Sequence, residues 1–123
     1  MPSLNILIVD NDPLEVDLIS RMLKDNYKGN FVLRRAESLE KADAILKTQR
    51  TDVVLLDCET IDNQNPNDLI LALSAIDKLA PTILISNEID FSYLKENVLL
   101  DVYDIVDKFN LRKRIANDLL TGL

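Results

Sequence analysis

The segment ILIVDNDPLE, from Ile6 to Glu15, decides the fold class, because an apolar run stops at Asp10 and a helix start follows it. Consecutive branched apolar residues are typical of a strand that is buried on both faces of a parallel sheet. Asp12 followed by Pro13 predicts the helix, since aspartate is a good N-cap and proline suits the first helical position. Helix capping does not explain why an aspartate stands at position 10. A carboxylate at the end of a buried strand is costly unless something binds it.

The same alternation of strand and helix continues along the chain. Apolar runs predict strands at residues 5–10, 31–35, 52–57, 81–86 and 102–108. Apolar residues at helical spacing predict helices through Leu14–Met22, Leu39–Leu46, Leu69–Ile76, Phe91–Val98 and Leu111–Leu119. Ser38 and Asn110 are expected to cap the second and the last of these. This order predicts an α/β fold, a doubly wound five-stranded parallel sheet with five helices on its two faces.

Length and composition indicate a single ordered domain spanning residues 1–123. Hydrophobic residues make up 47% of the chain and charged residues 28%, which is typical of globular proteins. The single Cys58 excludes an internal disulfide. A formal net charge of −7 argues against binding to a phosphate backbone. Neither a membrane-spanning run nor a signal peptide is evident, so we expect a cytoplasmic protein.

Four polar side chains are predicted to meet at one edge of the sheet. Asp10, Asp57, Ser86 and Lys108 each end a predicted strand, and ligands bind outside the carboxyl ends of strands in open α/β sheets. Paired carboxylates suit Mg²⁺, which prefers oxygen ligands. A carboxylate can also attack phosphorus, while a lysine and a hydroxyl contact the transferring group.

These residues resemble those of a two-component response-regulator receiver domain, and the likeness covers essentially the whole chain. The acid pair of that family falls on Asp10 and Asn11, and its phosphoacceptor on Asp57 of DVVLLD. Its hydroxyl residue falls on Ser86 of PTILIS, and its lysine on Lys108 of DIVDK. The resemblance implies a flavodoxin-like topology. It also implies a phosphoryl group accepted on Asp57 from a sensor histidine kinase or a histidine phosphotransfer protein.

The resemblance further implies a cofactor and partners. Mg²⁺, or Mn²⁺, would be held by Asp10, Asn11, Asp57 and the backbone carbonyl of Glu59. Catalysis would go no further than the domain's own phosphorylation and dephosphorylation. Output would pass to a downstream protein or a tethered output domain, without contact of this domain with nucleic acid or membrane. Whether the chain is a stand-alone receiver or part of a longer protein, and whether it forms a homodimer, stay open.

Departures from the family pattern leave other functions open. Asn11 replaces the usual second acid, Ile105 stands where an aromatic residue is common, and Phe109 replaces a proline. These changes fit a degenerate receiver that only binds other proteins. A phosphohydrolase of the haloacid-dehalogenase type, with Asp10 as nucleophile and Asp12 as acid/base, ranks lower. The helix predicted to begin at Pro13 leaves no room for the insert which that family carries there.

Overall fold

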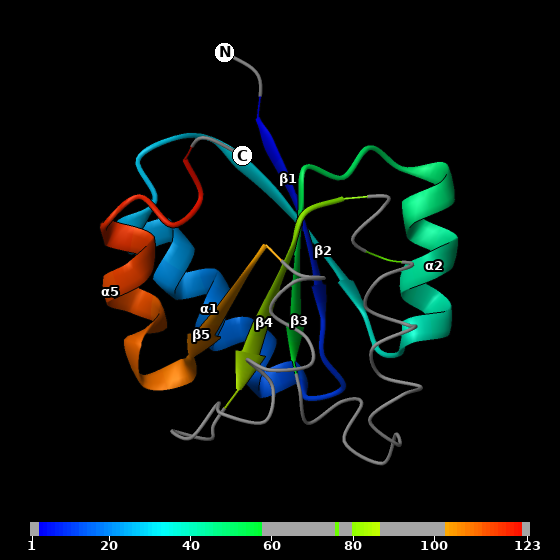
Figure 1. Ribbon diagram of the computed structural model, residues 1–123, viewed down its shortest axis with the longest axis horizontal. Coiled ribbons are helices and arrows are strands. Elements are labelled where there is room, and N and C mark those ends of the chain that lie inside the picture. The colour runs from blue at the N-terminus through cyan, green and yellow to red at the C-terminus, as the bar shows by residue number, and fades with distance from the viewer. Residues whose placement is uncertain (1–2, 58–75, 77–79, 87–102, 122–123) are drawn as a thin grey trace.

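The computed structural model describes residues 3–57, 76, 80–86 and 103–121. Within them five parallel strands form one sheet in the order β2-β1-β3-β4-β5 (Figure 1). The strands are β1 Leu4–Val9, β2 Phe31–Ala36, β3 Val53–Asp57, β4 Thr82–Ser86 and β5 Asp104–Asp107. The described helices are α1 Pro13–Asn26, α2 Leu39–Thr48 and α5 Leu111–Ala116, with the 3₁₀ helix η3 at Lys108–Asn110. The parallel five-stranded sheet predicted from the apolar runs is therefore confirmed.

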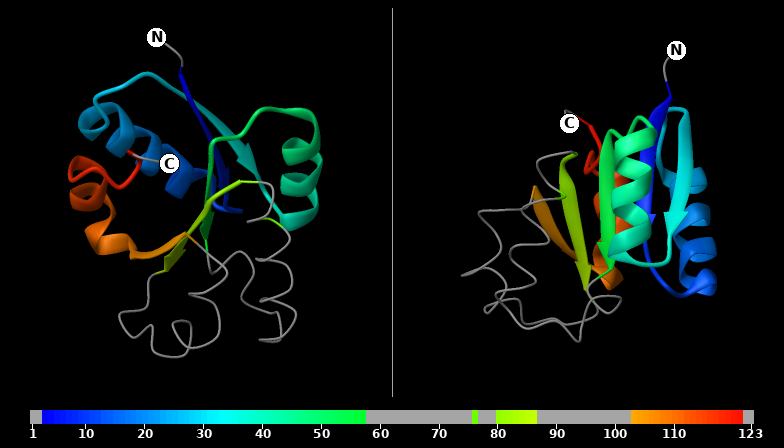
Figure 2. Two further views of the ribbon diagram at one scale, coloured as in Figure 1. Left: turned by 45° about the horizontal axis from the view of Figure 1, so that its top comes forward. Right: turned by 90° about the vertical axis from the view of Figure 1, so that its right-hand side faces the viewer.

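Helices cover both faces of this sheet, as the doubly wound prediction requires (Figures 1 and 2). Side chains of β1 alternate between the faces, so that Ile6 and Ile8 pack with α1 and α5, while Leu7 and Val9 pack on the side of α2. These side chains are almost completely buried. Burial of each contributes roughly 1.5–3 kcal/mol relative to exposure, which makes β1 the centre of the core.

The first two helices begin where the sequence predicts. The Asp12 carboxylate accepts a hydrogen bond of 3.0 Å from the amide of Leu14, and Pro13 is the first residue of α1. The Ser38 hydroxyl accepts one of 3.2 Å from the amide of Lys41 and caps α2. Each cap satisfies a helical amide that has no partner inside the helix.

The last helix differs from its prediction at both ends. Asn110 precedes α5 but makes no side-chain capping hydrogen bond. Instead the carboxylate of Asp107 accepts from the amide of Phe109 at 2.8 Å and starts η3. Helix α5 ends at Ala116, earlier than expected, and Asp118 has a φ of 72°, which a right-handed helix does not allow. The apolar spacing reached Leu119 because that side chain is buried without being helical.

The helices predicted at Leu69–Ile76 and Phe91–Val98 lie outside the described residues, apart from Ile76. That residue is helical and buried against the sheet on the side of α2. Among the residues described, no helix combines the length and the apolar character needed to cross a membrane.

The strand order places the ends of two central strands side by side. β1 and β3 are neighbours, and the chain moves outward from β1 to β2 on one side and from β3 to β5 on the other. This is the point at which the direction of winding reverses, where ligands of open α/β sheets bind. Asp10 follows β1 and Asp57 ends β3, so both carboxylates lie at that point.

Candidate functional site

Asp10 is a fully buried carboxylate with one oxygen engaged and one without a partner. Its amide donates to the carbonyl of Ala36 at 2.9 Å, which extends the pairing of β1 with β2 by one residue. Its Oδ1 accepts from the amide of Asp12 at 2.9 Å. Its Oδ2 is buried and has no hydrogen-bond partner among the residues that the structure describes. A buried oxygen in this state is unfavourable for the apo protein, so a bound cation or proton would stabilise it.

The surroundings of Asp10 raise its pKa to about 7. Burial is the main cause, because it disfavours the charged form. The hydrogen bond from Asp12 and the charge of Lys108 oppose the rise, whereas the charges of Asp57 and Glu15 add to it. Asp10 is thus poised to exchange a proton for a cation near neutral pH.

Asp57 faces an ammonium group that comes from a different strand end. Its side chain is 5% exposed, and its Oδ1 lies 2.8 Å from Nζ of Lys108. Lys108 is the first residue of η3, directly after β5, and β4 separates β5 from β3. The lysine therefore reaches across the end of β4 to meet the carboxylate.

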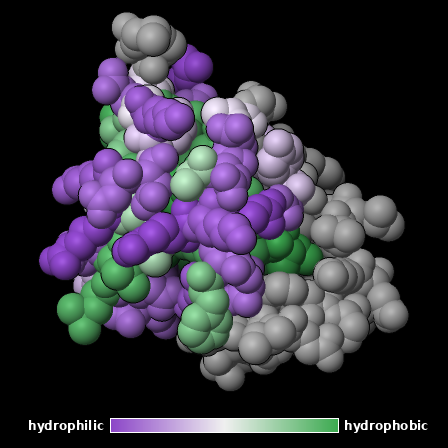
Figure 3. Space-filling view, turned by 90° about the vertical axis from the view of Figure 1, so that its left-hand side faces the viewer, coloured by the Kyte–Doolittle hydropathy of each residue, from purple (hydrophilic) through white to green (hydrophobic). Residues whose placement is uncertain are grey.

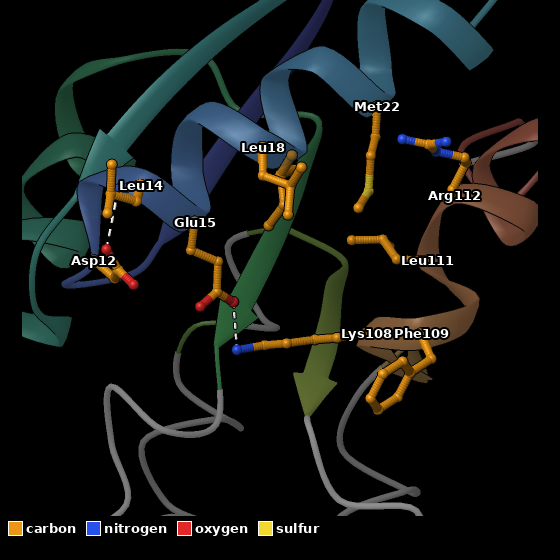
Figure 4. A pocket seen from close by; sticks show the side chains of 10 residues that line it. Asp12, Leu14, Glu15, Leu18, Met22, Lys108, Phe109, Leu111 and Arg112 are labelled. Carbon is orange, nitrogen blue, oxygen red and sulfur yellow. Dashed lines mark hydrogen bonds and ion pairs between the residues drawn. The ribbon is translucent and has the colours of Figure 1, made fainter.

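Lys108 also contacts Glu15, a residue that sequence reasoning did not place in the site. Glu15 lies in the first turn of α1, and its carboxylate points to Nζ of Lys108 (Figure 4). Carboxylate oxygens of Asp10, Glu15 and Asp57 all lie within 4.8 Å of one another. The sequence contained a weak indication that Glu15 lies near the site, because the first turn of α1 must start next to the end of β1. An acid in a first turn is also common for helix-dipole reasons alone.

The two carboxylates keep Lys108 charged. Burial lowers the pKa of its ammonium, but the hydrogen bonds and charges of Asp57 and Glu15 outweigh that effect, so the pKa lies above its ordinary value. Among the described residues, three carboxylates thus lie around one cationic side chain. When all are ionised, the cluster carries two excess negative charges, which a divalent cation would neutralise.

The other residues predicted for the site are placed in part. Ser86 is the last residue of β4 and lies in register with Asp107, the neighbour of Lys108. Asn11 is exposed and lies between Asp10 and Asp12. Glu59, predicted to offer its carbonyl to the metal, lies outside the described residues.

The donor set fits a hard divalent cation. Mg²⁺ takes oxygen ligands and is usually held by one or two carboxylates together with water and phosphate oxygens. Carboxylate oxygens of Asp10, Glu15 and Asp57 converge here, and Oδ2 of Asp10 is buried without a hydrogen-bond partner among the residues that the structure describes. The cation would be held by Asp10 and Asp57, and it would supply positive charge next to the Asp57 carboxylate.

The sequence matches the family model of the response regulator receiver domain over residues 6–119. The chain therefore belongs to that family, as its motifs predicted. No curated protein matches the chain by sequence.

Solved structures share its fold. A response regulator from Thermotoga maritima is 14% identical with a TM-score of 0.76, and the match covers 96% of this chain and 95% of that one. The phosphorylated cyanobacterial phytochrome response regulator RcpA is 18% identical with a TM-score of 0.71, covering 94% and 91%. A LuxR family DNA-binding response regulator from Silicibacter pomeroyi is 20% identical with a TM-score of 0.71, covering 94% and 88%. At these identities the likeness shows the flavodoxin-like receiver fold.

Proposed function

We propose that this protein is a phosphorylation-dependent signalling switch, in which Asp57 accepts a phosphoryl group from a phosphohistidine in the presence of Mg²⁺. The observation that carries the proposal is the contact of 2.8 Å between the buried Asp57 carboxylate and the Lys108 ammonium. Asp10 lies in the same cluster, and its Oδ2 is buried without a hydrogen-bond partner among the described residues. A nucleophile, a charge partner and a cation-binding carboxylate thus lie together. That set is what transfer of a phosphoryl group to a carboxylate needs.

Each residue has a separate part in the proposed transfer. An oxygen of Asp57 forms the new bond to phosphorus, while the phosphorus–nitrogen bond to the donor histidine breaks and its electron pair stays on the imidazole. Lys108 then moves its contact from the Asp57 carboxylate to a phosphoryl oxygen, with the Ser86 hydroxyl as a second donor. Asp10, Asn11 and the backbone carbonyl of Glu59 would hold the cation together with Asp57.

An apolar groove beside the site supports a protein as the phosphodonor. The groove measures about 660 Å³ and lies between α1 and the segment from Lys108 to Arg112, with Glu15 and Lys108 in its wall (Figure 4). Leu14 and Phe109, which also line it, are each 80% exposed. The face that carries α1 and α5 is otherwise mainly hydrophilic (Figure 3). Because the groove is continuous with the acceptor site, it supports a sensor histidine kinase or a histidine phosphotransfer protein as the proposed occupant.

The proposed function also implies a cellular location and a downstream target. We expect the chain to act in the cytoplasm, where a partner kinase that uses phosphohistidine would reach it. The phosphorylated domain passes the signal to a downstream protein or to a tethered output domain.

The test is intact-mass measurement after incubation with acetyl phosphate. We expect one added phosphoryl group that requires Mg²⁺ and is absent in Asp57→Asn. If no adduct forms, binding of beryllofluoride separates rapid hydrolysis from an inactive site. Failure to bind this stable mimic would overturn the proposal and favour the degenerate receiver, an alternative that Asn11 and Ile105 motivate.

One hydrogen bond of Asp12 argues against a phosphohydrolase of the haloacid-dehalogenase type. It uses Asp12 as acid/base, yet the Asp12 carboxylate accepts from the amide of Leu14 and caps α1. Turnover of a phosphate ester that survives Asp57→Asn but not Asp10→Asn would revive it.

A further inference from the structure

We propose that Glu15 is a third carboxylate of the cation site and supplies the negative charge that Asn11 lacks. The inference rests on the proposed function, because it concerns the cation that accompanies phosphorylation of Asp57. It assigns a role to a residue on α1, away from the strand ends on which the motif residues lie.

The direction of the Glu15 side chain is the first argument. It leaves the first turn of α1 and points to the acceptor site, where it meets Lys108 (Figure 4). Only 20% of the side chain is exposed. One of its oxygens lies within 4.8 Å of oxygens of both Asp10 and Asp57. Opposite oxygens around an octahedral Mg²⁺ are about 4.2 Å apart, so a small movement brings the three into one coordination shell.

Ordinary helix-start roles do not account for this position. A glutamate three residues after an N-cap commonly accepts from the amide of the capping residue. Here the amide of Asp12 donates to Asp10 instead. A glutamate that serves the helix dipole needs no buried partner, as Glu40 illustrates, since it is exposed in the first turn of α2.

The state of Asp10 is an independent observation that points to a ligand. Its Oδ2 is buried and lacks a partner among the described residues. An oxygen of the same carboxylate lies in one cluster with oxygens of Glu15 and Asp57. Polar atoms buried in this way are rare in folded proteins, and a bound ion is one accepted explanation. The buried oxygen of Asp10 therefore supports a bound cation at this cluster of carboxylates, independently of the position of Glu15.

Exchange of partners follows from the bridge that Lys108 makes. In the structure the Lys108 ammonium binds both Glu15 and Asp57. With a divalent cation in the site, Glu15 would be a ligand of that cation instead of a partner of Lys108, and the Lys108 ammonium would be available to the phosphoryl oxygens at Asp57. Glu15 therefore couples occupation of the cation site to release of the lysine.

The experiment is calorimetric titration of the unphosphorylated full chain with MgCl₂. We expect Glu15→Gln to weaken Mg²⁺ binding at least tenfold, because it removes the charge and keeps the shape. Glu40→Gln makes the same change in the first turn of α2 and should bind like the wild type. The double variant Asn11→Asp with Glu15→Gln should recover most of the affinity, since it returns the lost charge to the neighbouring strand end.

The titration and the phosphorylation assay together distinguish failure of the Glu15 assignment from failure of the proposed function. Wild-type affinity in Glu15→Gln overturns the assignment of Glu15 and leaves the proposed function intact. A loss that Asn11→Asp does not recover also overturns it, because Glu15 would then act through the position of Lys108. Absence of both Mg²⁺ binding and phosphorylation in the wild type would overturn the proposed function itself. Urea unfolding without Mg²⁺ verifies that every variant is folded.

Discussion

The Lys108 ammonium lies 2.8 Å from Oδ1 of Asp57 and so joins the end of β5 to the end of β3. The same ammonium binds Glu15 at the start of α1. A single side chain thus ties together three elements that are distant in sequence. Because Lys108 contacts both carboxylates, the charge at Asp57 is part of the electrostatic environment of Glu15 in α1 and of Lys108 in η3.

Replacing Lys108 tests how strongly this ammonium offsets the carboxylates. Lys108→Met leaves Asp10, Glu15 and Asp57 facing one another without a cation. We expect the free energy of unfolding without Mg²⁺ to fall by about 2 kcal/mol, because buried charges lose their partner. Urea unfolding at neutral pH measures this. Saturating Mg²⁺ should restore part of the loss, and an unchanged midpoint without Mg²⁺ would contradict the ion pairs seen here.

The raised pKa of Asp10 predicts the pH dependence of the cation-free protein. The pKa is about 7 in the folded state against 3.8 for the ordinary group. Protonated Asp10 therefore adds stability that is fully present below about pH 4 and is lost as the pH rises through about 7. One pKa unit corresponds to about 1.4 kcal/mol, so urea unfolding should show a loss of roughly 2 kcal/mol or more.

Asp10→Asn should remove most of this loss, since the amide carries no charge to bury. It should also be more stable than the wild type above neutral pH while binding Mg²⁺ poorly. Addition of Mg²⁺ should flatten the wild-type profile. A wild-type stability that does not change between pH 4 and pH 8 in a chelating buffer would show that Asp10 is not desolvated as described.

Asp52 lies before the start of β3, at the opposite end of the strand from Asp57, and its pKa shifts in the direction opposite to that of Asp10. Its carboxylate accepts from the backbone amide of Asn5 at 2.7 Å and from the Asn5 side chain at 3.2 Å. The amide hydrogen bond is the main reason that the pKa of Asp52 lies below its usual value. Asp52→Ala should cost about 2 kcal/mol at neutral pH, as hydrogen bonds to charged groups do.

The stability that Asp52 adds is present above its unfolded pKa and is lost as the pH falls through its lower folded pKa. The cost of Asp52→Ala should therefore shrink in acid. Phosphorylation by acetyl phosphate should be unchanged, because this residue precedes β3 whereas Asp57 ends it. Slower phosphorylation in a folded Asp52→Ala protein would contradict this separation.

If the apolar groove docks the phosphodonor, substitutions in it should slow phosphoryl transfer from a protein donor but not from acetyl phosphate. Leu14→Ser with Phe109→Ser removes two exposed apolar side chains and should change the free energy of unfolding by little. Labelling by acetyl phosphate should be unaffected. Transfer from a phosphorylated histidine phosphotransfer protein should slow at least fivefold, as followed by loss of its label. Equal slowing with both donors would place the effect in the acceptor site rather than in docking.

The strands and the first two helix caps could be predicted because their causes are local. A run such as residues 53–56 is apolar without a break, and its burial on both faces confirms the parallel-sheet interpretation. Asp12 and Ser38 cap helices through amides two or three residues away. The end of α5 could not be found in this way, because Leu119 is buried by tertiary packing after the helix has stopped.

By itself the sequence determined the fold class and the positions of Asp10, Asp57, Ser86 and Lys108 at strand ends. Alternation of strand and helix implies a parallel sheet, and a parallel sheet gathers those ends at one edge. Only the tertiary structure decided that Glu15 meets Lys108 and that one oxygen of Asp10 has no hydrogen-bond partner within the part of the chain that the structure describes. The physical reason is that these contacts depend on how α1 turns relative to β5, which is set by core packing between segments far apart in the chain.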